Sequence, residues 1–529
     1  MLFNSFEFLL LFLPAVALGF YLIAQFQRLA PVLLWLIACS LVFHGYWKAS
    51  YTWLFVTSMA ANYCIGQVFW LCREASTFVR KSVLIIGIGF NIALLGYFKY
   101  AFFFAEILRD VTGYQWESGE IILPLAISFY TFQQIAYLVD CYRRHAPRYS
   151  PLQYASYLAF FPHLIAGPIV QHRDLVAQLS DQRILFVRGE NLSSGIAILW
   201  IGLFKKVVLA DGAAAYANPI FAAAGAGTSV TFCEAWIAAL LFSFVIYFDF
   251  SGYSDMAIGL ARLFNVKFPE NFASPYKAVN IIEFWRRWHI TLSWFLRDYL
   301  YIPLGGGRRG QLRRYGNILI TMLLGGLWHG ASWTFVIWGG LHAVYLVVAH
   351  IWNEAKRRFG LPHTGAIGRF AGRTMTYLAV VVAWIFFRAR TPQDAISMLG
   401  SMAGFNGVSL PSELPIAVRD SLRDAFGAAV SFQGLAPHVD LPAGPFGVPI
   451  LSALALCATL LVAVNVLPNT QQVMRIFRPV LHDSSERVTG IARFLVWRLT
   501  PIRVAIVTAV GMYGMTHLEN VQSFIYFRF

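Results

Sequence analysis

His329 stands out because its ionisable side chain lies in a stretch, residues 322–345, that is otherwise apolar, aromatic or small. Polar groups are costly at membrane depth and usually face a cavity or a partner. Imidazole also titrates close to neutral pH, which suits it to general-base catalysis. We therefore predict that His329 is catalytic. The alternative is a histidine that is only hydrogen-bonded inside a helix bundle.

His289 is the second candidate. A polar run at 247–255 closes an apolar helix with two carboxylates and several hydroxyls, and the sequence EFWRRWH at 283–289 follows. Such groups need partners or water near a membrane, so we predict a hydrated vestibule that includes His289. On a helix, Arg286 and His289 would lie one turn apart on one face. The alternative is an amphipathic helix whose Arg286, Arg287 and His289 only bind lipid headgroups.

A glycine-rich, basic loop at 303–309 is the third candidate feature. Three glycines precede Arg308 and Arg309 in this loop. Arginines form charge-assisted hydrogen bonds with phosphates, so the loop could contact an anionic donor such as a coenzyme A thioester. It matches no phosphate-binding signature, and a solvated turn is the alternative.

The composition places these candidates in a membrane protein. Of the 529 residues, 58% are hydrophobic and 13% charged, whereas soluble domains are about a quarter charged. The mean hydropathy is +0.60. The net charge of +15 falls in loops that border apolar segments, where anionic lipid headgroups explain it, and we expect no nucleic-acid partner. The six cysteines lack metal-ligand or disulfide spacing, so we expect no metal and no bound cofactor.

Apolar segments long enough to cross a membrane recur along the chain, given roughly 20 residues per crossing. We predict an all-α polytopic membrane protein with about eleven transmembrane helices plus re-entrant and in-plane helices. A single domain spans 1–529, with core motifs at 121–350 and accessory helices at 375–529. The predicted spans are 7–25, 31–47, 51–72, 83–108, 121–139, 193–210, 233–249, 375–390, 447–466 and 503–518.

Three stretches do not fit single spans. Residues 284–303 are too polar to face lipid, and prolines and glycines interrupt 152–168, as expected of a re-entrant segment. Residues 317–350 would measure about 50 Å as one helix, which exceeds the bilayer, so we predict a broken or hairpin arrangement. The glycines expected to break the helix around the first histidine are Gly325, Gly326 and Gly330.

Basic residues predict the orientation, because cytoplasmic loops carry an excess of Lys and Arg. We assign to the outside both termini and three segments with few or no cations, 110–120, 212–232 and 405–445. The clusters assigned to the cytoplasm lie at 73–81, 143–148, 308–314, 356–358 and 475–503. Four cations lie near the predicted outer ends of helices instead: Lys205, Lys206, Arg388 and Arg390. For these we expect only snorkelling or a position facing a cavity.

Long motifs over nearly the whole chain resemble the membrane-bound O-acyltransferase family, and within it the bacterial alginate O-acetyltransferase branch. The motifs that carry the resemblance are MLFNSFEFLLLFLP at the start, ISFYTFQQIAYLVDCYRR (127–144), FFPHLIAGPIVQ (160–171), GLFKKVVLAD (202–211), YFDFSGYSDMAIGLARLFN (247–265), NFASPY and FWRRWHITLSWFLRDYLYIPLGG within 271–306, GGLWHGASWTFVIWGGLHA (325–343) and the closing FIYFRF.

The resemblance implies a helix bundle around a central tunnel, an acyl thioester such as acetyl-coenzyme A entering from the cytoplasm as donor substrate, and an acceptor on the other face. The family's motif histidines fall on His329 and His289. No nucleophile arrangement is visible around His329, so direct transfer or a short relay is favoured over a stable acyl-enzyme. The residues predicted to bind the donor are Arg286, Arg287, Arg297, Asp298, Arg308 and Arg309. The residues predicted to line the tunnel and exclude water are Trp328, Trp333, Asp249 and Tyr253.

The resemblance further implies O-acetylation of an exported polysaccharide, alginate or a related polymer, at the bacterial inner membrane. Expected partners are membrane lipids, the acyl donor, polysaccharide-export components and a periplasmic acetyltransferase that resembles SGNH hydrolases, docking on the outer loops at 110–120 and 405–445. The alternatives are D-alanyl transfer to another envelope polymer, or a transporter or flippase without acyl chemistry. The sequence shows no internal repeat, which counts against a transporter. A purely structural scaffold would not explain the polar residues around His289 and His329.

Overall fold

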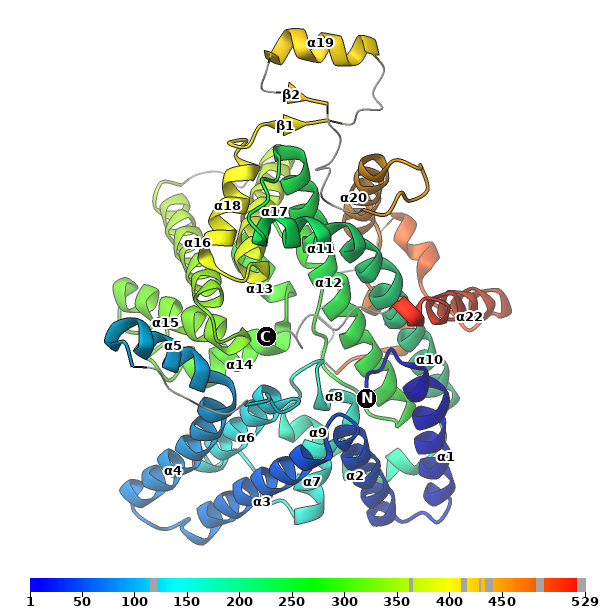
Figure 1. Ribbon diagram of the computed structural model, residues 1–529. Coiled ribbons are helices and arrows are strands. Elements are labelled where there is room, and N and C mark those ends of the chain that lie inside the picture. The colour runs from blue at the N-terminus through cyan, green and yellow to red at the C-terminus, as the bar shows by residue number, and fades with distance from the viewer. Residues whose placement is uncertain are drawn as a thin grey trace.

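The computed structural model is built from helices arranged around one long central helix, α12 (Phe232–Leu263) (Figure 1). The structure describes residues 1–114, 121–360, 365–410, 416–427, 430–432, 441–481 and 490–520. Within these ranges the strands are the two-residue β1 (Val408–Ser409) and β2 (Val430–Ser431), which pair in parallel. The prediction of an all-α polytopic membrane protein is confirmed.

The helices follow one another with short connections, and several are continued by a turn of π- or 3-10 helix. The first group is η1 (Glu7–Phe12), α1 (Leu13–Ala24), α2 (Leu29–Gly45), α3 (Ala49–Leu71), α4 (Thr77–Leu95), η2 (Gly96–Tyr100), α5 (Ala101–Thr112) and α6 (Ile127–Tyr142). The middle group is α7 (Pro151–Ala159), α8 (Phe161–Leu164), α9 (His172–Leu179), η3 (Gln182–Leu185), α10 (Gly189–Phe204), η4 (Lys205–Ala210), α11 (Asp211–Gly225), α12, η5 (Pro275–Lys277), α13 (Ile281–Arg287), α14 (Ile290–Leu296) and η6 (Arg297–Tyr301). The last group is α15 (Gln311–His329), α16 (Trp333–Arg358), α17 (Ala366–Arg388), α18 (Pro392–Met402), α19 (Ile416–Phe426), α20 (Pro449–Val466), α21 (Thr470–Val473), η8 (Arg475–Phe477), η9 (Gly490–Leu495), α22 (Pro501–Met515) and η10 (Leu518–Asn520).

Helices α10 and α12 touch main chain to main chain along a seam of two glycine pairs. A Cβ atom added at Gly202 would lie 2.6 Å from the carbonyl oxygen of Gly252, and one added at Gly195 would lie 2.8 Å from that of Gly259. Both distances are too short for real Cβ atoms, so only glycine fits at this seam. Small residues are the usual means of bringing membrane helices this close.

The polar run 247–255 does not end the apolar helix, as its composition had suggested. Helix α12 continues through it to Leu263 because its carboxylates meet cations from the adjoining η4 turn. Lys206 Nζ lies 2.8 Å from Asp249 Oδ1, and Lys205 Nζ lies 2.6 Å from Asp255 Oδ2. These pairs also account for two lysines that the predicted topology left unexplained.

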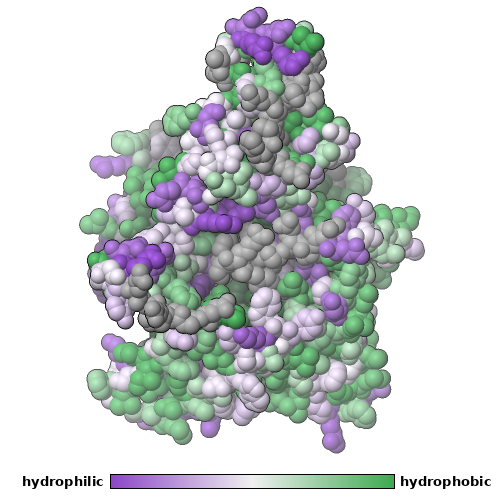
Figure 2. All heavy atoms as spheres, in the orientation of Figure 1, coloured by the Kyte–Doolittle hydropathy of each residue, from purple (hydrophilic) through white to green (hydrophobic). Residues whose placement is uncertain are grey.

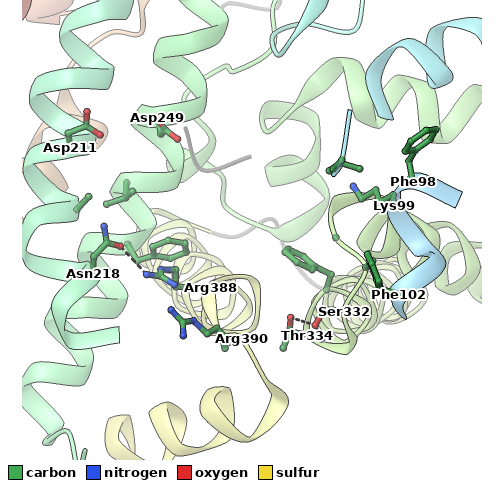
Figure 3. A pocket seen from close by; sticks show the side chains of 18 of the residues that line it. Phe98, Lys99, Phe102, Asp211, Asn218, Asp249, Ser332, Thr334, Arg388 and Arg390 are labelled. Carbon is green, nitrogen blue, oxygen red and sulfur yellow. Dashed lines mark hydrogen bonds between the residues drawn. The ribbon is translucent and has the colours of Figure 1, made fainter. Parts of the chain in front are cut away.

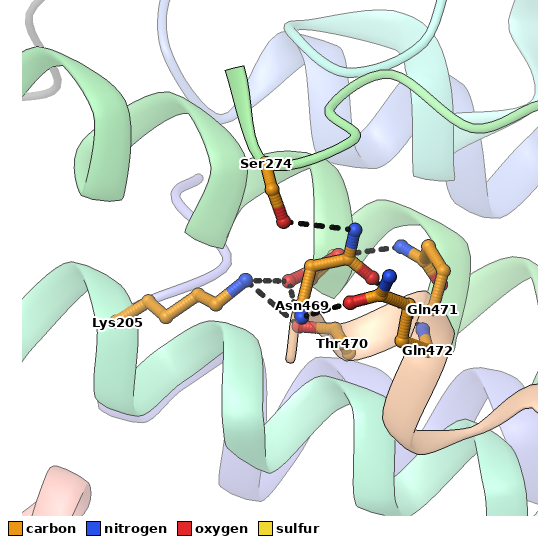
Figure 4. A network of polar contacts seen from close by, with 7 residues as sticks. Lys205, Ser274, Asn469, Thr470, Gln471 and Gln472 are labelled. Atoms are coloured by element: carbon orange, nitrogen blue, oxygen red, sulfur yellow. Dashed lines mark hydrogen bonds and ion pairs between the residues drawn. The ribbon is translucent and has the colours of Figure 1, made fainter. Parts of the chain in front are cut away.

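Asp255 fastens a distant part of the chain to α12 (Figure 4). Its Oδ2 accepts hydrogen bonds from Lys205 Nζ and from Thr470 Oγ1, each at 2.6 Å. Its Oδ1 accepts a hydrogen bond from Gln471 Nε2 at 2.9 Å. Asp255 is 4% exposed, so this carboxylate is buried and satisfied by three donors. We call these four residues the α12–α21 latch.

Eight helical segments of the described chain are long and apolar enough to cross a membrane, and two shorter apolar helices, α2 and α22, join them. The predicted span 121–139 is different, because α6 begins only at Ile127 and buries polar side chains that include Gln133, Gln134 and Asp140. Large apolar side chains are exposed on the outer helices, and Figure 2 shows hydrophobic atoms over the part of the surface where α1 to α4 lie. The interrupted stretches behave as predicted, since 152–168 and 284–303 form only short helical pieces.

Candidate active site

His329 is the last residue of α15, at the point where the expected hairpin turns into α16. Gly330 adopts an extended conformation, with φ −160° and ψ 148°, and ends the helix. A Cβ atom at Gly326 would lie 2.2 Å from the carbonyl oxygen of Phe335, so this glycine lets α16 approach α15 closely. Gly325 and Gly326 therefore lie inside the helix, which corrects the prediction that they break it. Only Gly330 marks the break.

Aromatic rings enclose His329, which is 5% exposed. The centroid of its ring lies 4.9 Å from that of Trp328, 5.0 Å from that of Trp338 and 5.4 Å from that of Phe387. Three helices, α15, α16 and α17, supply these rings. The imidazole is thus held in an apolar cage that fixes its orientation and excludes bulk water.

His289 is fully buried and takes an unusual backbone conformation. It precedes α14 with φ 41° and ψ 55°, in the left-handed region that non-glycine residues rarely occupy. The short helices α13 and α14 meet at this residue, so the predicted single helical face shared by Arg286 and His289 does not form. Strained residues of this kind cluster at functional sites.

Asn271 sets the orientation and tautomer of His289. Its Oδ1 lies 3.1 Å from His289 Nδ1 and accepts a hydrogen bond from Thr291 Oγ1 at 3.0 Å, while its Nδ2 donates to Ser254 Oγ at 3.1 Å. Because Oδ1 can only accept, Nδ1 of His289 carries the proton. The lone pair on Nε2 is left available, and Nε2 has no hydrogen-bond partner among the described residues.

Both histidines pack against Trp328, so the two predicted residues belong to one site. The Trp328 centroid is 4.9 Å from the His329 ring and 6.4 Å from the His289 ring. Trp328 also stacks on Phe132 of α6 at 4.9 Å, and it is 4% exposed. Trp328 therefore joins the two histidines in one packed cluster, and its predicted place in a tunnel wall stays a prediction.

A cavity of about 620 Å³ opens beside His329 (Figure 3). Its wall on one side comes from α11, α12 and the end of α17, and on the other side from η2, α5 and the turn between α15 and α16. Gly330, Ala331 and Ser332 continue directly from His329 into this wall. The cavity thus reaches the residue next to the histidine.

The cavity carries charges of both signs. Lys206, 1% exposed, pairs with Asp211 Oδ1 and Asp249 Oδ1, each at 2.8 Å. Arg388 Nη2 donates to Asn218 Oδ1 at 3.2 Å (Figure 3). The cations predicted near the outer ends thus include three that face this cavity, since Arg390 lines it beside Arg388.

Known proteins with similar sequences identify the family. The model of the membrane-bound O-acyltransferase family matches residues 141–388. The chain is 42% identical over 437 residues to a peptidoglycan O-acetyltransferase of Helicobacter pylori, which covers 78% of this chain and 81% of that protein. The chain belongs to the membrane-bound O-acyltransferase family. It is also 40% identical over 419 residues to a probable alginate O-acetylase of Pseudomonas putida, covering 78% of this chain and 82% of that one.

The likeness of this membrane-bound O-acyltransferase to teichoic acid D-alanyltransferases is weaker. The Bacillus subtilis protein is 27% identical over 279 residues, covering 50% of this chain and 67% of that protein. The family match makes the chain an enzyme, an O-acyltransferase, and the long apolar helices make it a multi-pass membrane protein.

The predicted donor-binding residues are not among the residues that line the cavity of this acyltransferase. Arg287 Nη2 is engaged with Glu283 Oε1 at 2.6 Å, and Arg297 Nε with Asp298 Oδ1 at 2.7 Å. The exposed side chains among the predicted set are Arg286, Arg297, Arg308 and Arg309. Their role in donor binding stays a prediction.

Three of the predicted tunnel residues, Trp328, Trp333 and Tyr253, are not among those that line the cavity, and the tunnel stays a prediction. Trp333 is 54% exposed and packs on Phe103, so it does not wall the site; Phe335, two residues further on, lines the cavity instead. Tyr253 is fully buried and stacks on Phe3 with centroids 4.7 Å apart. Asp249 does line the cavity. Asn271 was not singled out by the sequence, because its hydrogen-bond partners lie on other segments of the chain.

Proposed function

We propose that this membrane O-acyltransferase moves an acetyl group from a cytoplasmic thioester donor, acetyl-coenzyme A, across the membrane for O-acetylation of an exported polysaccharide. The relatives named for alginate and peptidoglycan O-acetylation support the polysaccharide, and each matches most of this chain. The proposed polymer is alginate or a related exopolymer. The enzyme lies in the bacterial inner membrane, with both of its termini in the periplasm.

One observation carries the proposal: a buried histidine stands at the edge of a cavity, and a second histidine packs on the same tryptophan. Neither a metal centre nor a nucleophile triad is needed for acyl transfer in such a site, because a positioned base suffices to activate a hydroxyl. The apolar cage around His329 limits the access of water that would hydrolyse the thioester.

In the proposed reaction, His329 takes the proton from the acceptor hydroxyl as its oxygen bonds to the acyl carbon. The carbon–sulfur bond breaks, and the thiolate leaves and receives the proton from His329. The acceptor is the hydroxyl of a partner or of the polymer. A periplasmic acetyltransferase that resembles SGNH hydrolases then delivers the group to the polysaccharide. His289, oriented by Asn271, positions the donor.

The test uses purified protein in lipid nanodiscs, with release of free coenzyme A from acetyl-coenzyme A measured in the presence of hydroxyl acceptors. Oligosaccharides of mannuronate and of N-acetylglucosamine serve as separate acceptors. We expect His329→Ala to lose roughly 10²- to 10⁴-fold in turnover, the usual contribution of a general base. His145→Ala, which changes an exposed histidine, serves as the control.

Near-parental turnover in His329→Ala would remove His329 from the mechanism. His289→Ala should weaken the apparent affinity for the donor. A loss of turnover without that change would contradict the positioning role. If the parent protein consumes no thioester with any acceptor but moves a labelled substrate across the membrane, the transporter alternative replaces the proposal.

A further inference from the structure

The helix that carries His329 ends without a cap of its own. The last four carbonyl oxygens of an α-helix have no partner within the helix and need one from elsewhere. Many helices solve this with a left-handed glycine that folds its N–H back, but Gly330 is extended and only its amide reaches back, to Gly326 O at 3.4 Å. The three carbonyls that follow must be satisfied by other parts of the chain.

Two consecutive residues of η2 supply the missing donors. Tyr100 Oη donates to Leu327 O at 2.9 Å. Lys99 Nζ donates to Trp328 O at 2.6 Å and to His329 O at 3.2 Å. With the Gly330 amide, these contacts satisfy all four terminal carbonyls of α15. We call Lys99 and Tyr100 the α15 clamp.

The geometry of Lys99 distinguishes a clamp from a ligand-binding cation. An ammonium group has three N–H donors. Besides the two carbonyls, Lys99 Nζ is 3.4 Å from Ser128 Oγ on α6, so three acceptors surround three donors. Although Lys99 lines the cavity, its hydrogen bonds are directed to protein rather than to the open space.

Charge and environment both strengthen the clamp. The C-terminal end of a helix carries a partial negative charge, so a cation placed there is stabilised, more so when partly buried. Unsatisfied carbonyls at membrane depth are costly because no bulk water replaces a lost donor. Lys99 and His329 are far apart in the sequence, so their contact joins two distant elements of the chain, η2 and α15.

We propose that Lys99, assisted by Tyr100, is a positioning residue for His329: it holds the last turn of α15 so that the imidazole stands correctly at the cavity. This inference rests on the proposed function, in which His329 is the base. Lys99 makes its hydrogen bonds near the site to the main chain of Trp328 and His329 and not to the imidazole. Loss of the clamp frees the terminal turn and displaces the imidazole.

The experiment compares Lys99→Met, which keeps the length and removes the donors, with Tyr100→Phe and with Lys81→Met. Lys81 lies on α4, continuous with η2, and is exposed, so its substitution controls for the lost charge. Turnover and the KM for acetyl-coenzyme A are measured in nanodiscs, and amide hydrogen exchange is followed over residues 320–335. All variants must elute as a single species with the parental Tm; otherwise Lys99→Gln, which keeps two N–H donors, replaces Lys99→Met.

We expect Lys99→Met to lose roughly 10- to 100-fold in kcat with an unchanged KM, because a small displacement of a catalytic group has effects of this size. Exchange should accelerate at residues 326–330 and nowhere else. Tyr100→Phe, which removes one bond of three, should lose only a few-fold. The Lys81→Met control should match the parent in both measurements.

Two results would overturn the proposal. Parental kcat in Lys99→Met would show that His329 needs no clamp. Lost kcat with parental exchange would show that the ammonium acts through its charge on the substrate or on the imidazole rather than on the helix. Hydrogen exchange does not depend on the reaction, so accelerated exchange in a protein whose parent consumes no thioester would refute the proposed function and leave the clamp intact.

Discussion

At the scale of single residues, Asn271 controls the chemistry available to His289. Its carboxamide contacts the imidazole, the Thr291 hydroxyl and the Ser254 hydroxyl, and it is 1% exposed. A buried amide with this many partners cannot rotate without leaving several polar groups unsatisfied. The orientation of His289 therefore depends on a side chain that itself performs no chemistry.

Replacing Asn271 by Leu removes the acceptor while keeping the number and branching of the side-chain heavy atoms. We expect the KM for the donor to rise, as for His289→Ala, so that turnover at a fixed, subsaturating donor concentration falls roughly 10- to 100-fold, with Tm lowered by the polar groups left unpaired. Steady-state turnover and thermal unfolding in detergent would measure both effects. Asn465→Leu on α20, where the amide bonds only Leu461 O at the surface, is the control. Unchanged turnover in Asn271→Leu would show that the orientation of His289 does not matter.

Arg308 and Arg309 offer a second test at this scale. Both are exposed in the densest predicted cytoplasmic cluster, where they would raise the local concentration of a phosphate-bearing donor. We expect Arg308→Gln/Arg309→Gln to raise the KM for acetyl-coenzyme A about 3- to 10-fold with kcat unchanged. Added salt should have the same effect on the parent and a smaller one on the variant.

The control for this pair is Arg419→Gln/Arg423→Gln on α19, which removes the same charge from the far end of the molecule (Figure 1). Equal KM and equal salt dependence in all three proteins would assign the cluster to lipid headgroups alone. The donor entrance would then be sought around Arg286, Arg287 and Arg297.

Sequence reasoning located the two histidines but not the residues that hold them. An imidazole in an apolar stretch is visible without knowledge of the fold. The importance of Asn271 and Lys99 becomes visible only when segments far apart in the chain meet, since an isolated amide or lysine carries no signal of its own. Trp333 is not among the cavity-lining residues for a related reason, because residues close in sequence to His329 can point to opposite sides of the turn.

At the scale of elements, the α15–α16 hairpin depends on direct contact between helix backbones. A Cβ atom at Gly326 would lie 2.2 Å from Phe335 O, whereas one at Gly316 on the same helix meets nothing within 4 Å. We expect Gly326→Ala to lower stability by about 1–3 kcal/mol and to reduce turnover, because overpacking displaces the helix end. Gly316→Ala should raise stability by about 0.5–1 kcal/mol. Equal thermal unfolding of the two variants would contradict the contact.

The α12–α21 latch gives another prediction for packed elements. Asp255→Ala leaves Lys205 without its buried carboxylate partner and should cost about 3–5 kcal/mol. The double variant Lys205→Met/Asp255→Leu removes both charges and should be closer to the parent. Denaturation in detergent measures the free energy of unfolding of each variant. A double variant less stable than Asp255→Ala would show that the Lys205–Asp255 ion pair stabilises the protein by more than the cost of burying its charges.

The ends of helices were predictable where the composition of the sequence changes. They were not predictable where ion pairs with another segment let a helix continue through a polar stretch. The hairpin in 317–350 and the interrupted stretch 284–303 followed from length and polarity. The continuation of α12 through 247–255 did not, because η4 brings two lysines to its carboxylates from another segment. Gly326 looked like a helix breaker and is instead a packing contact.

At the scale of the whole molecule, the orientation in the membrane stays a prediction that fusions can test. A reporter active only in the periplasm should give a signal when inserted within 416–427, and none when inserted at 310–314. Parts of both predicted docking loops lie outside the described residues, namely 115–120 of the first loop and 411–415, 428–429 and 433–440 of the second. The closing motif FIYFRF also lies outside them. A cytoplasmic signal from 416–427 would invert the C-terminal third and move the docking face.

The glycine seam between α10 and α12 bears on how a group could cross the membrane at all. Alternating-access carriers work by rocking one helix bundle against another around a fixed site. Here two glycine pairs, about two helical turns apart, leave each backbone seated against its neighbour's carbonyls, so sliding or rotation would force main chains into each other. Helices α10 and α12 thus form one tightly packed pair. Under the proposed function it is the acyl group that travels, handed from one chemical bond to the next.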